Sequence, residues 1–582
     1  MKKIVLRPLP ENTGDLPESL HPVLRRIYQS RGIVSADELD LSLFRLPSPD
    51  RLKGMPAAVE RLERALKTSE KIIIVGDFDA DGATSTALAV SALKAMGFSQ
   101  VDFVVPNRFD FGYGLSPAVV DLVRPMGAAL LITVDNGISS VEGVAYARHF
   151  GMDVIVTDHH LPPAELPDAV AIINPSQPGC RFPARCIAGV GVVFYLMMGL
   201  RARLRAQGWF ESKGIGEPNL ADYLDLVALG TVADVVPLDY CNRVLVDQGL
   251  RRIRTGRVRP GIRALLEVAN REVARTVASD LSFFVAPRLN AAGRLTEMRY
   301  GVLCLLAASD AEAWSFAQEL DSMNRERREI EQDMQAQAVR ALGELAVSPQ
   351  QQMRAGLCLY DESWHQGVVG LLASRIKERY HRPVFCFALA GENELKGSGR
   401  SIPGFHIRDA LDAIASRQPG LITRFGGHAM AAGLSLDVSR YSAFVQAFGD
   451  EAERQLGIEA PEKIIEVDAK LTASELSLDF AALLREAGPW GQKFPEPVFV
   501  GEFRVKARRV LAEKYLKLTV APCVEEAAGM QIECEALCFS PEPAWFDIEA
   551  GQEVELVYRL DINVFNGRES LQLVVESLGL FG

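Results

Sequence analysis

The stretch IIIVGDFDADGATSTALAV, residues 72–90, joins an apolar run to three closely spaced aspartates and then to a helix-like segment. Asp77, Asp79 and Asp81 thus stand at the mouth of what the pattern predicts to be a buried strand. Carboxylates this close repel one another and cost free energy unless something positive lies among them. A metal ion, a basic partner or water at an exposed loop could meet this need.

A rhythm of short apolar runs separated by helical or loop segments begins at residue 71. Strands that read as continuous apolar runs and alternate with helices indicate an α/β domain whose parallel sheet is covered on both faces. The expected strands are KIIIVG (71–76), VDFVVP (101–106), ALLITV (129–134), DVIVT (153–157) and AVAIINP (169–175).

The composition is that of a multidomain globular protein, with 582 residues, 48% hydrophobic and 24% charged. The N-terminus turns polar by Arg7 and no apolar run approaches 18 residues, so we expect neither a signal peptide nor a membrane span. The nine cysteines include no CxxC pair, which favours reduced thiols in the cytoplasm.

The net charge of −12 by itself argues against a nucleic-acid partner. Two local runs argue the other way: RRIRTGRVRPGIR (251–263) has six arginines and no acid, and SRIKERYHR (374–382) is also basic. Each run could equally be a solvated helix or loop face. A metal enzyme that acts on polyanions would combine acidic ligands at its centre with basic patches around them.

The rest of the chain divides by pattern. The first 70 residues look mostly helical and polar, residues 310–345 are rich in helix formers, and short alternating strands follow residue 461. The expected order is an N-terminal helical segment (1–45), the parallel-sheet domain (46–309), a linking helix (310–348), a mixed α/β domain (349–457) and an all-β domain (458–582).

Further acids and two histidines follow other predicted elements. Asp135 follows the third strand, Asp158, His159 and His160 follow the fourth, and Asp234 follows a helical run. The carboxyl ends of parallel strands share one edge of a sheet, so these side chains should converge. Aspartates with one or two histidines and no thiolate suit Mg²⁺ or Mn²⁺ before Zn²⁺. Taken singly, each aspartate could instead be a loop or helix N-cap residue.

Four motifs carry a resemblance: DFDADG (77–82), TVDNGIS (133–139), VTDHH (156–160) and GTVADVV (230–236). They resemble the DHH phosphoesterase family, named for the triplet seen here as Asp158-His159-His160. Further motifs resemble the RecJ exonucleases of that family: APRLNAAGRL (286–295), WHQGVVGLLASRIKER (364–379), KGSGRS (396–401) and FGGHAMAAGLSL (425–436). The resemblance implies a DHH catalytic domain, a DHHA1-type substrate-binding domain and a C-terminal OB-fold.

The resemblance also implies the function and its partners. It points to a metal-dependent 5′-to-3′ exonuclease that degrades single-stranded DNA to 5′-mononucleotides in recombination and repair. The single-stranded-DNA-binding protein and repair helicases would be partners of a monomeric enzyme. Two rivals are a phosphodiesterase for oligoribonucleotides or cyclic dinucleotides, and a binding module without catalysis. The long OB-like extension argues against the first, and the intact acid set against the second.

By the same resemblance, two divalent ions, Mn²⁺ or Mg²⁺, are held by two groups of side chains: Asp77 with Asp79, and Asp81 with His159 and Asp234. Asp135 bridges both ions, as its central place among the strands also suggests. His160 faces the scissile phosphate as a donor or acid, and Asp158 orients a histidine. Pyrophosphatases of the family have a histidine where Val75 stands here, which counts against that activity.

Several residues are candidates for binding the substrate. The segment KGSGRS is expected to be a glycine-spaced loop that brings amides and a basic group to a phosphate, or else a flexible turn between strands. Tyr113 could stack a base or be packed in the interior. Arg504, Lys506, Arg508, Arg509 and Lys517 would form a basic face of the OB-fold, or a merely solvated one. The other candidates are Asn107, Arg108, Arg294, Arg375, Lys396, Ser398, Arg400 and His428.

Overall fold

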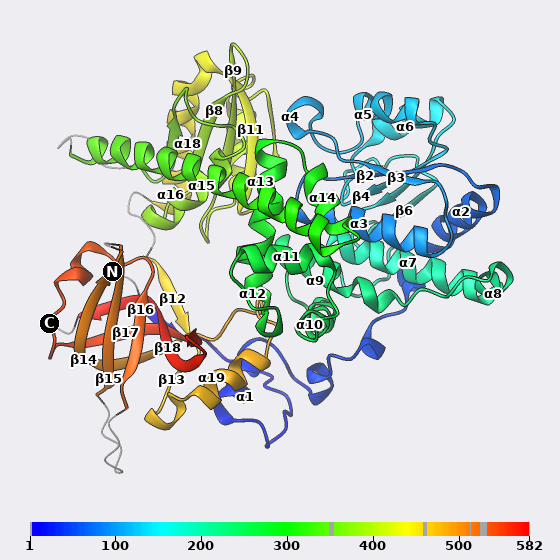
Figure 1. The fold of residues 1–582 in the computed structure, drawn as a ribbon. Coiled ribbons are helices and arrows are strands. Elements are labelled where there is room, and N and C mark those ends of the chain that lie inside the picture. The colour runs from blue at the N-terminus through cyan, green and yellow to red at the C-terminus, as the bar shows by residue number, and fades with distance from the viewer. Residues whose placement is uncertain (1–2, 348–353, 458–461, 513, 524–531, 581–582) are drawn as a thin grey trace. The chain divides into compact units, whose positions relative to one another are not determined.

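The computed structural model describes residues 3–347, 354–457, 462–512, 514–523 and 532–580 (Figure 1). The chain divides into two compact units. The smaller is built around Glu319–Ile464, and the larger is formed mainly by Ile4–Asn290, Glu297–Gln318 and Ile465–Gly582. Among the described residues, every helix is too short or too polar to traverse a lipid bilayer.

The larger unit contains a five-stranded parallel sheet in the order β3-β2-β4-β5-β6. Strands β2 and β4 are buried along their whole length, as expected of strands covered on both faces. Helices α3 (Ala80–Ala95) and α7 (Gly189–Ala206) cover one face, and α5 (Pro117–Val123) and α6 (Val141–His149) the other (Figure 1). All five predicted strands are confirmed: β2 (Ile72–Gly76), β3 (Val101–Val104), β4 (Leu130–Val134), β5 (Asp153–Thr157) and β6 (Ala171–Ile173).

Helices follow the sheet and include the arginine-rich run. They are α9 (Leu224–Ala233), α10 (Tyr240–Arg254), α11 (Pro260–Val268), α12 (Ala278–Asp280), the π-helical turn η7 (Leu281–Val285), α13 (Ala286–Leu295) and α14 (Arg299–Leu306). The arginines of 251–263 mostly have carboxylate partners: Arg252 pairs with Asp222, and Arg259 with the buried Asp225 at 2.9 Å. The run is therefore largely neutralised by acids that lie outside it.

The prediction of a mostly helical N-terminal segment is wrong. Within residues 1–45 only α1 (Pro22–Ser30) and two single 3₁₀ turns are helical, and β1 (Lys3–Leu6) pairs instead with β12 (Ile464–Val467). The other long helix of the first 70 residues, α2 (Met55–Thr68), lies beyond this segment. The prolines in RPLPENTGDLPES (7–19) prevent a continuous helix. Arg31 just after α1 makes a buried two-point ion pair with Asp468, at 2.7 and 3.0 Å, which ties this segment to the start of the C-terminal domain.

The long helix α15 (Asp310–Val347) confirms the predicted linking helix, and its part from Glu319 onward belongs to the smaller unit. The mixed sheet of this unit runs β10-β11-β9-β8-β7. The strands are β7 (Leu357–Tyr360), β8 (Val384–Leu389), β9 (Glu394–Arg400), β10 (Arg424–Gly427) and β11 (Ala431–Asp437), and the helices are α16 (Val369–Tyr380), α17 (Ile407–Arg417) and α18 (Tyr441–Leu456).

The expectation of a loop at KGSGRS is wrong, because residues 396–400 lie in strand β9. The glycines of β9 are explained by packing against neighbouring side chains and not by a turn. A Cβ on Gly397 would lie 2.4 Å from the ring of Phe387, and one on Gly399 would lie 2.5 Å from the ring of Phe385. The two aromatic rings thus occupy the space that side chains on β9 would need.

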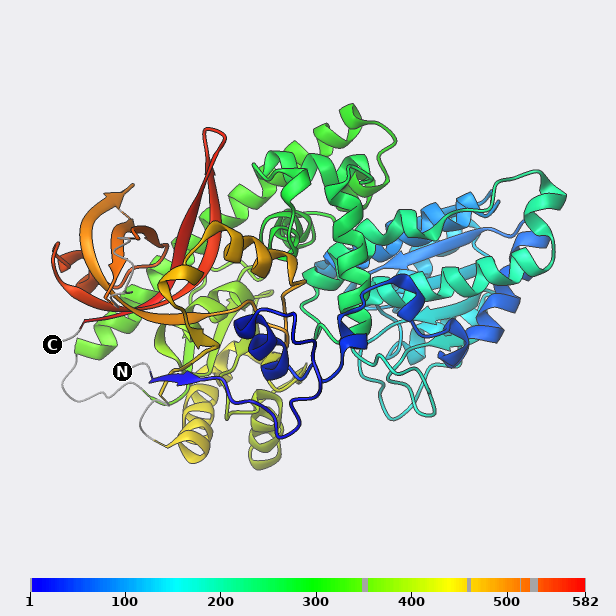
Figure 2. The same ribbon diagram turned by 90° about the horizontal axis from the view of Figure 1, so that it is seen from below.

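The C-terminal domain is a barrel in the order β13-β14-β15-β16-β18-β17, closed by pairing of β14 with β17. This confirms the expected OB-like fold. Figure 2 shows the long β17–β18 hairpin standing out from the barrel. The strands are β13 (Ala469–Lys470), β14 (Phe499–Leu511), β15 (Tyr515–Pro522), β16 (Cys534–Cys538), β17 (Glu553–Phe565) and β18 (Arg568–Leu580), and helix α19 (Leu478–Glu486) lies ahead of β14.

The packing at β9 predicts the result of one substitution. Gly399→Ala should destabilise the smaller unit by about 1–3 kcal/mol, because the new methyl group would overpack against Phe385. Differential scanning fluorimetry of the full chain measures the loss as a lower melting temperature. Gly426→Ala is the matched control, since no atom lies within 4 Å of its Cβ position. Equal melting of the two variants would contradict the packing explanation.

Candidate active site

The predicted acids and histidines meet at the carboxyl edge of the parallel sheet. Asp77 and Asp79 follow β2, Asp135 follows β4, and the 158–160 triplet follows β5. The backbone amide of Asp135 donates to the carbonyl of Thr157 at 3.0 Å, which extends the ladder to the very end of both strands. The parallel register therefore brings together side chains that are far apart in the sequence.

Three groups of possible metal ligands lie at this edge, with donor atoms within 4.8 Å of one another in each group. His159 Nε2 lies 3.1 Å from Asp135 Oδ1 and 3.4 Å from Asp234 Oδ2, so it links the β4 and α9 sides of the site. The groups are Asp77 with Asp79 and Asp135, Asp81 with His159 and Asp234, and Asp135 with His159 and His160.

Burial and mutual repulsion raise the pKa values of these carboxyl groups. Burial, and then the charges of Asp81 and Asp79, raise the pKa of Asp135 well above its ordinary value, and the pKa of Asp234 is raised by the same causes. The pKa of Asp81 is raised to about 7 by burial and then by Asp79. Burial lowers the pKa of His159 to about 4, so its ring is neutral.

Two observations show that a divalent cation fits this site. Asp135 Oδ1 and His159 Nε2 are buried without a hydrogen-bond partner among the described residues. A Cβ on Gly189 would lie 2.6 Å from Asp135 Oδ1, so only glycine leaves that oxygen clear. Buried carboxylate oxygens and a neutral imidazole in this arrangement form the donor set of Mn²⁺ or Mg²⁺ sites.

The amino end of α7 holds the Asp81 carboxylate. Asp81 accepts hydrogen bonds from the backbone amides of Gly189, at 2.6 Å, and Val190, at 2.9 Å. A Cβ on Gly230 would lie 2.7 Å from Asp81 Oδ1, so a second glycine permits the approach of α9. The helix dipole of α7 favours the ionised form of this carboxylate.

Asp158 and His160 form a second hydrogen-bonded pair. The buried Asp158 accepts from the backbone amides of His159 and His160 and from Ile138 N, and its Oδ1 lies 2.7 Å from His160 Nδ1. Burial lowers the pKa of His160, but the hydrogen bond and charge of Asp158 outweigh burial and raise it to about 9. His160 therefore carries a proton at neutral pH, with Nδ1 held by Asp158.

Two asparagines that the sequence analysis did not select also shape the site. Asn290 Oδ1 accepts from the backbone amide of Ala80 at 2.8 Å, where the DFDADG loop enters α3. Asn136 donates to the carbonyls of Val75 and Val134, the neighbouring ends of β2 and β4. Asn136 lies in the motif TVDNGIS and Asn290 in APRLNAAGRL, so the motifs could have pointed to both residues. Their hydrogen-bond partners could not be read from the sequence.

Three predicted substrate contacts lie between β3 and α5. The Tyr113 hydroxyl lies 3.1 Å from His160 Nδ1 and donates to the carbonyl of Asp135 at 3.2 Å, and the side chain is 49% exposed. Tyr113 is thus neither packed in the interior nor a free ring for stacking a base, because its hydroxyl contacts residues of the site. Asn107 is partly buried, and the Arg108 side chain lies outside the described residues.

Six predicted substrate contacts lie in the smaller unit. Alternate residues of β9 share one face, where Arg400 Nη1 donates to Ser398 Oγ at 3.2 Å. Arg375 pairs with Glu331 at 2.9 Å rather than standing free. Contact of these side chains with a substrate stays a prediction. The six are Arg294, Arg375, Lys396, Ser398, Arg400 and the exposed His428.

Comparison with known proteins covers all three predicted domains. Family models match in the predicted order: the DHH family, N-terminal domain, over residues 71–231, the DHHA1 domain over 353–454, and the RecJ OB domain over 467–577. The order and type of the domains, as implied by the resemblance, are confirmed.

Whole-chain relatives agree. The single-stranded-DNA-specific exonuclease RecJ of Escherichia coli is 52% identical over 568 residues, 98% of this chain and 97% of the relative. That of Haemophilus influenzae is 46% identical over 581 residues, 99% of each. A crystal structure of RecJ in complex with Mn²⁺ from Thermus thermophilus is 29% identical, with a TM-score of 0.75 over 100% of this chain and 79% of that chain. The chain therefore belongs to the RecJ family of single-stranded-DNA-specific exonucleases.

Proposed function

We propose that this metal-dependent, single-stranded-DNA-specific exonuclease carries out hydrolysis at the carboxyl edge of β2, β4 and β5, and releases 5′-mononucleotides from the 5′ end. The buried, facing acceptors Asp135 Oδ1 and His159 Nε2, 3.1 Å apart, carry this assignment. The relatives are named for single-stranded DNA, and solved relatives contain Mn²⁺ or Mg²⁺. The polarity and the role in recombination and repair follow from the family resemblance.

Two divalent ions, Mn²⁺ or Mg²⁺, would be held by two sets of side chains, with Asp135 shared between them. The sets are Asp77 with Asp79, and Asp81 with His159 and Asp234. When bound, such ions polarise the phosphate and activate water for in-line displacement. The chain itself holds the ligand side chains in position. The amides of Gly189 and Val190 hold Asp81, and Asn290 holds the loop that carries Asp79. The ligands are thus in place before the substrate arrives.

His160 would face the scissile phosphate. Its side chain is 36% exposed, so the substrate can reach it, while the fully buried Asp158 holds Nδ1. That leaves Nε2 of a protonated imidazole to donate a hydrogen bond to a phosphate oxygen, or a proton to the leaving oxygen. Asp158 acts through His160 and is a positioning residue.

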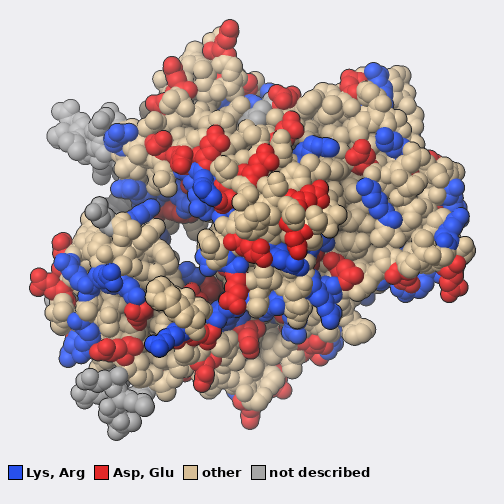
Figure 3. Space-filling model, in the orientation of Figure 1, with Lys and Arg blue, Asp and Glu red and all other residues tan. Residues whose placement is uncertain are grey.

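The barrel would guide the strand toward this site. Lys506, Arg508 and Arg509 are exposed on β14, whereas Arg504 and Lys517 pair with Glu553 and Glu535. On the face shown in Figure 3, basic side chains alternate with acidic ones over the barrel. A mixed surface of this kind weakly attracts phosphates and leaves the bases to provide the remaining contacts.

The cellular setting rests on the family alone. We propose a monomer in the cytoplasm that works with the single-stranded-DNA-binding protein and with recombination and repair helicases. Substrate contacts by Asn107, Arg108 and the residues of the smaller unit belong to the same proposal.

Loss of the shared carboxylate should abolish catalysis. Asp135→Ala should lower the rate on a 5′-labelled single strand by about a thousandfold or more, since metal-ion catalysis is worth several kcal/mol. The assay compares single-stranded with blunt duplex DNA, with Mn²⁺, with Mg²⁺ and with chelator. The exposed Asp412 supplies the control Asp412→Asn, which should keep full activity. Cleavage by Asp135→Ala at the unaltered rate would overturn the assignment.

Removal of the Asp158 charge should free His160. In Asp158→Asn the pKa of His160 should fall from about 9 toward its ordinary 6.5, because the partner that outweighs burial is gone. NMR titration of labelled imidazoles in the metal-free protein measures the shift. In the unaltered protein the pair's stabilisation is complete below about pH 6.5 and is lost as the pH rises through 9. Activity should fall about 10–100-fold. An unchanged His160 titration would contradict the pairing.

Metal binding should release protons. The pKa of Asp81 is raised to about 7, so at pH 6 the metal-free site is protonated there and Mn²⁺ must displace a proton. Calorimetry at pH 6 in buffers of different ionisation enthalpy should show proton release, and affinity should rise between pH 6 and 8. Asp81→Asn should release fewer protons. Mn²⁺ affinity that is independent of pH would rule out this coupling.

A further inference from the structure

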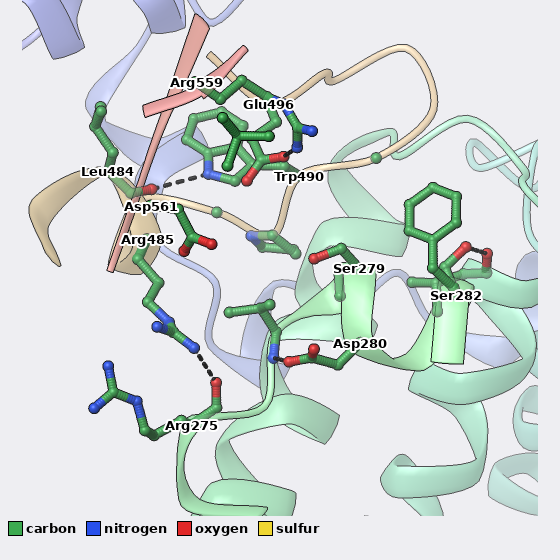
Figure 4. A pocket seen from close by; sticks show the side chains of 18 of the residues that line it. Arg275, Ser279, Asp280, Ser282, Leu484, Arg485, Trp490, Glu496, Arg559 and Asp561 are labelled. Carbon is green, nitrogen blue, oxygen red and sulfur yellow. Dashed lines mark hydrogen bonds and ion pairs between the residues drawn. The ribbon is translucent and has the colours of Figure 1, made fainter. Parts of the chain in front are cut away.

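A half-open pocket of about 1110 Å³ lies between the helices that follow the sheet and the C-terminal barrel, all within the larger unit. Figure 4 shows side chains from several separate segments around it. They are Ser279, Asp280 and Ser282 of the α12–η7 turn, Arg485 of α19, Trp490 and Glu496 of the next loop, and Arg559 and Asp561 of β17.

Large apolar side chains line this pocket while remaining exposed. Phe283 is 69% exposed, Val235 57%, Phe539 52% and Val564 43%. They come from η7, the end of α9, the loop after β16 and the β17–β18 hairpin. Exposed apolar groups that gather in one concave place mark a binding site, whereas singly scattered ones do not.

The backbone is distorted at two of these residues. Phe283 lies in the π-helical turn Leu281–Val285, a conformation that is rare and concentrated at functional sites. Val235 has φ +60°, which is a strained value for a β-branched residue. Val235 directly follows Asp234, which belongs to a group of possible metal ligands, so one short segment after α9 contributes to both the catalytic edge and the lining of the pocket.

The charges of the pocket do not suit phosphate. Arg559 pairs with Glu496 and with Glu576, and Arg275 pairs with Glu569. The remaining lining combines carboxylates with arginines, which can hydrogen-bond to the edges of bases. The pocket therefore offers flat apolar surface and mixed hydrogen-bonding groups rather than surplus positive charge.

We infer that this pocket receives the unpaired bases of the strand that feeds the metal site, with the Phe283 ring as the stacking platform and the phosphates on the outside. The inference rests on the proposed function for its substrate. Stacking on an aromatic ring tolerates any base sequence. Bases paired in a duplex cannot present their faces to the ring, so the pocket selects for single strands.

Binding in the presence of chelator tests the inference apart from catalysis. Fluorescence anisotropy of a labelled oligothymidylate measures affinity, and an oligonucleotide containing 2-aminopurine reports stacking through quenching. Phe283→Ala should weaken binding about tenfold and relieve the quenching, while Phe283→Trp should retain both. Phe283→Leu keeps apolar bulk but lacks a ring face, and it should resemble Phe283→Ala. Phe44→Ala, at a 99% exposed phenylalanine outside the pocket, should change neither.

The outcomes separate the two proposals. If the unaltered protein cleaves single strands but Phe283→Ala binds with full affinity, the pocket is not a base site and the proposed function stands. If Phe283→Leu binds like the unaltered protein, stacking is overturned. If the unaltered protein neither binds nor cleaves single strands, the proposed function fails first. Weaker binding by Phe283→Ala and Phe283→Leu, with Phe283→Trp intact, supports the inference.

Discussion

Mutual repulsion among buried carboxylates at one edge of a parallel sheet is the constraint on which this structure depends. Asp81 and Asp135 are almost completely buried and lie close to further acids. The protein offsets part of the repulsion with fixed amides at the start of α7, and it leaves Asp135 Oδ1 and His159 Nε2 without partners. The repulsion that remains would be offset by the positive charge of a bound metal ion. The sheet, helix α7 and the glycines at 189 and 230 all serve that geometry.

The sequence was most informative where local pattern and tertiary environment agree. Strands β2 and β4 read as apolar runs because both of their faces are buried. Prediction failed where contacts with a distant part of the chain determine the local structure. The glycines of β9 look like a loop in the sequence, yet they make room for Phe385 and Phe387 on the neighbouring strand. The N-terminal segment holds its place through Arg31 and Asp468, 437 residues apart, which no local periodicity reveals.

The site was predictable to a similar degree and for a similar reason. One rule, that parallel strands end at a common edge, was enough to gather the acids and histidines. Residues that hold these side chains in position were not accessible to that rule. Asn290 reaches Ala80 across 210 residues, and Gly189 reaches Asp81 across 108. Such contacts depend on how α7 packs on the sheet and on where α13 meets the start of α3, and that packing follows from the whole core.

A metal site recognises the phosphodiester, which is the same in single and double strands. Groups that meet the bases can supply the selectivity that the metal site lacks. If the pocket receives bases as we infer, the two tasks meet at neighbouring residues, since Asp234 belongs to a group of possible metal ligands and Val235 lines the pocket. Val235 has a strained φ of +60° at this point of the chain. On this view, the segment after α9 places a possible metal ligand next to a residue of the base pocket, and strand selectivity is built into the catalytic domain as well as the barrel.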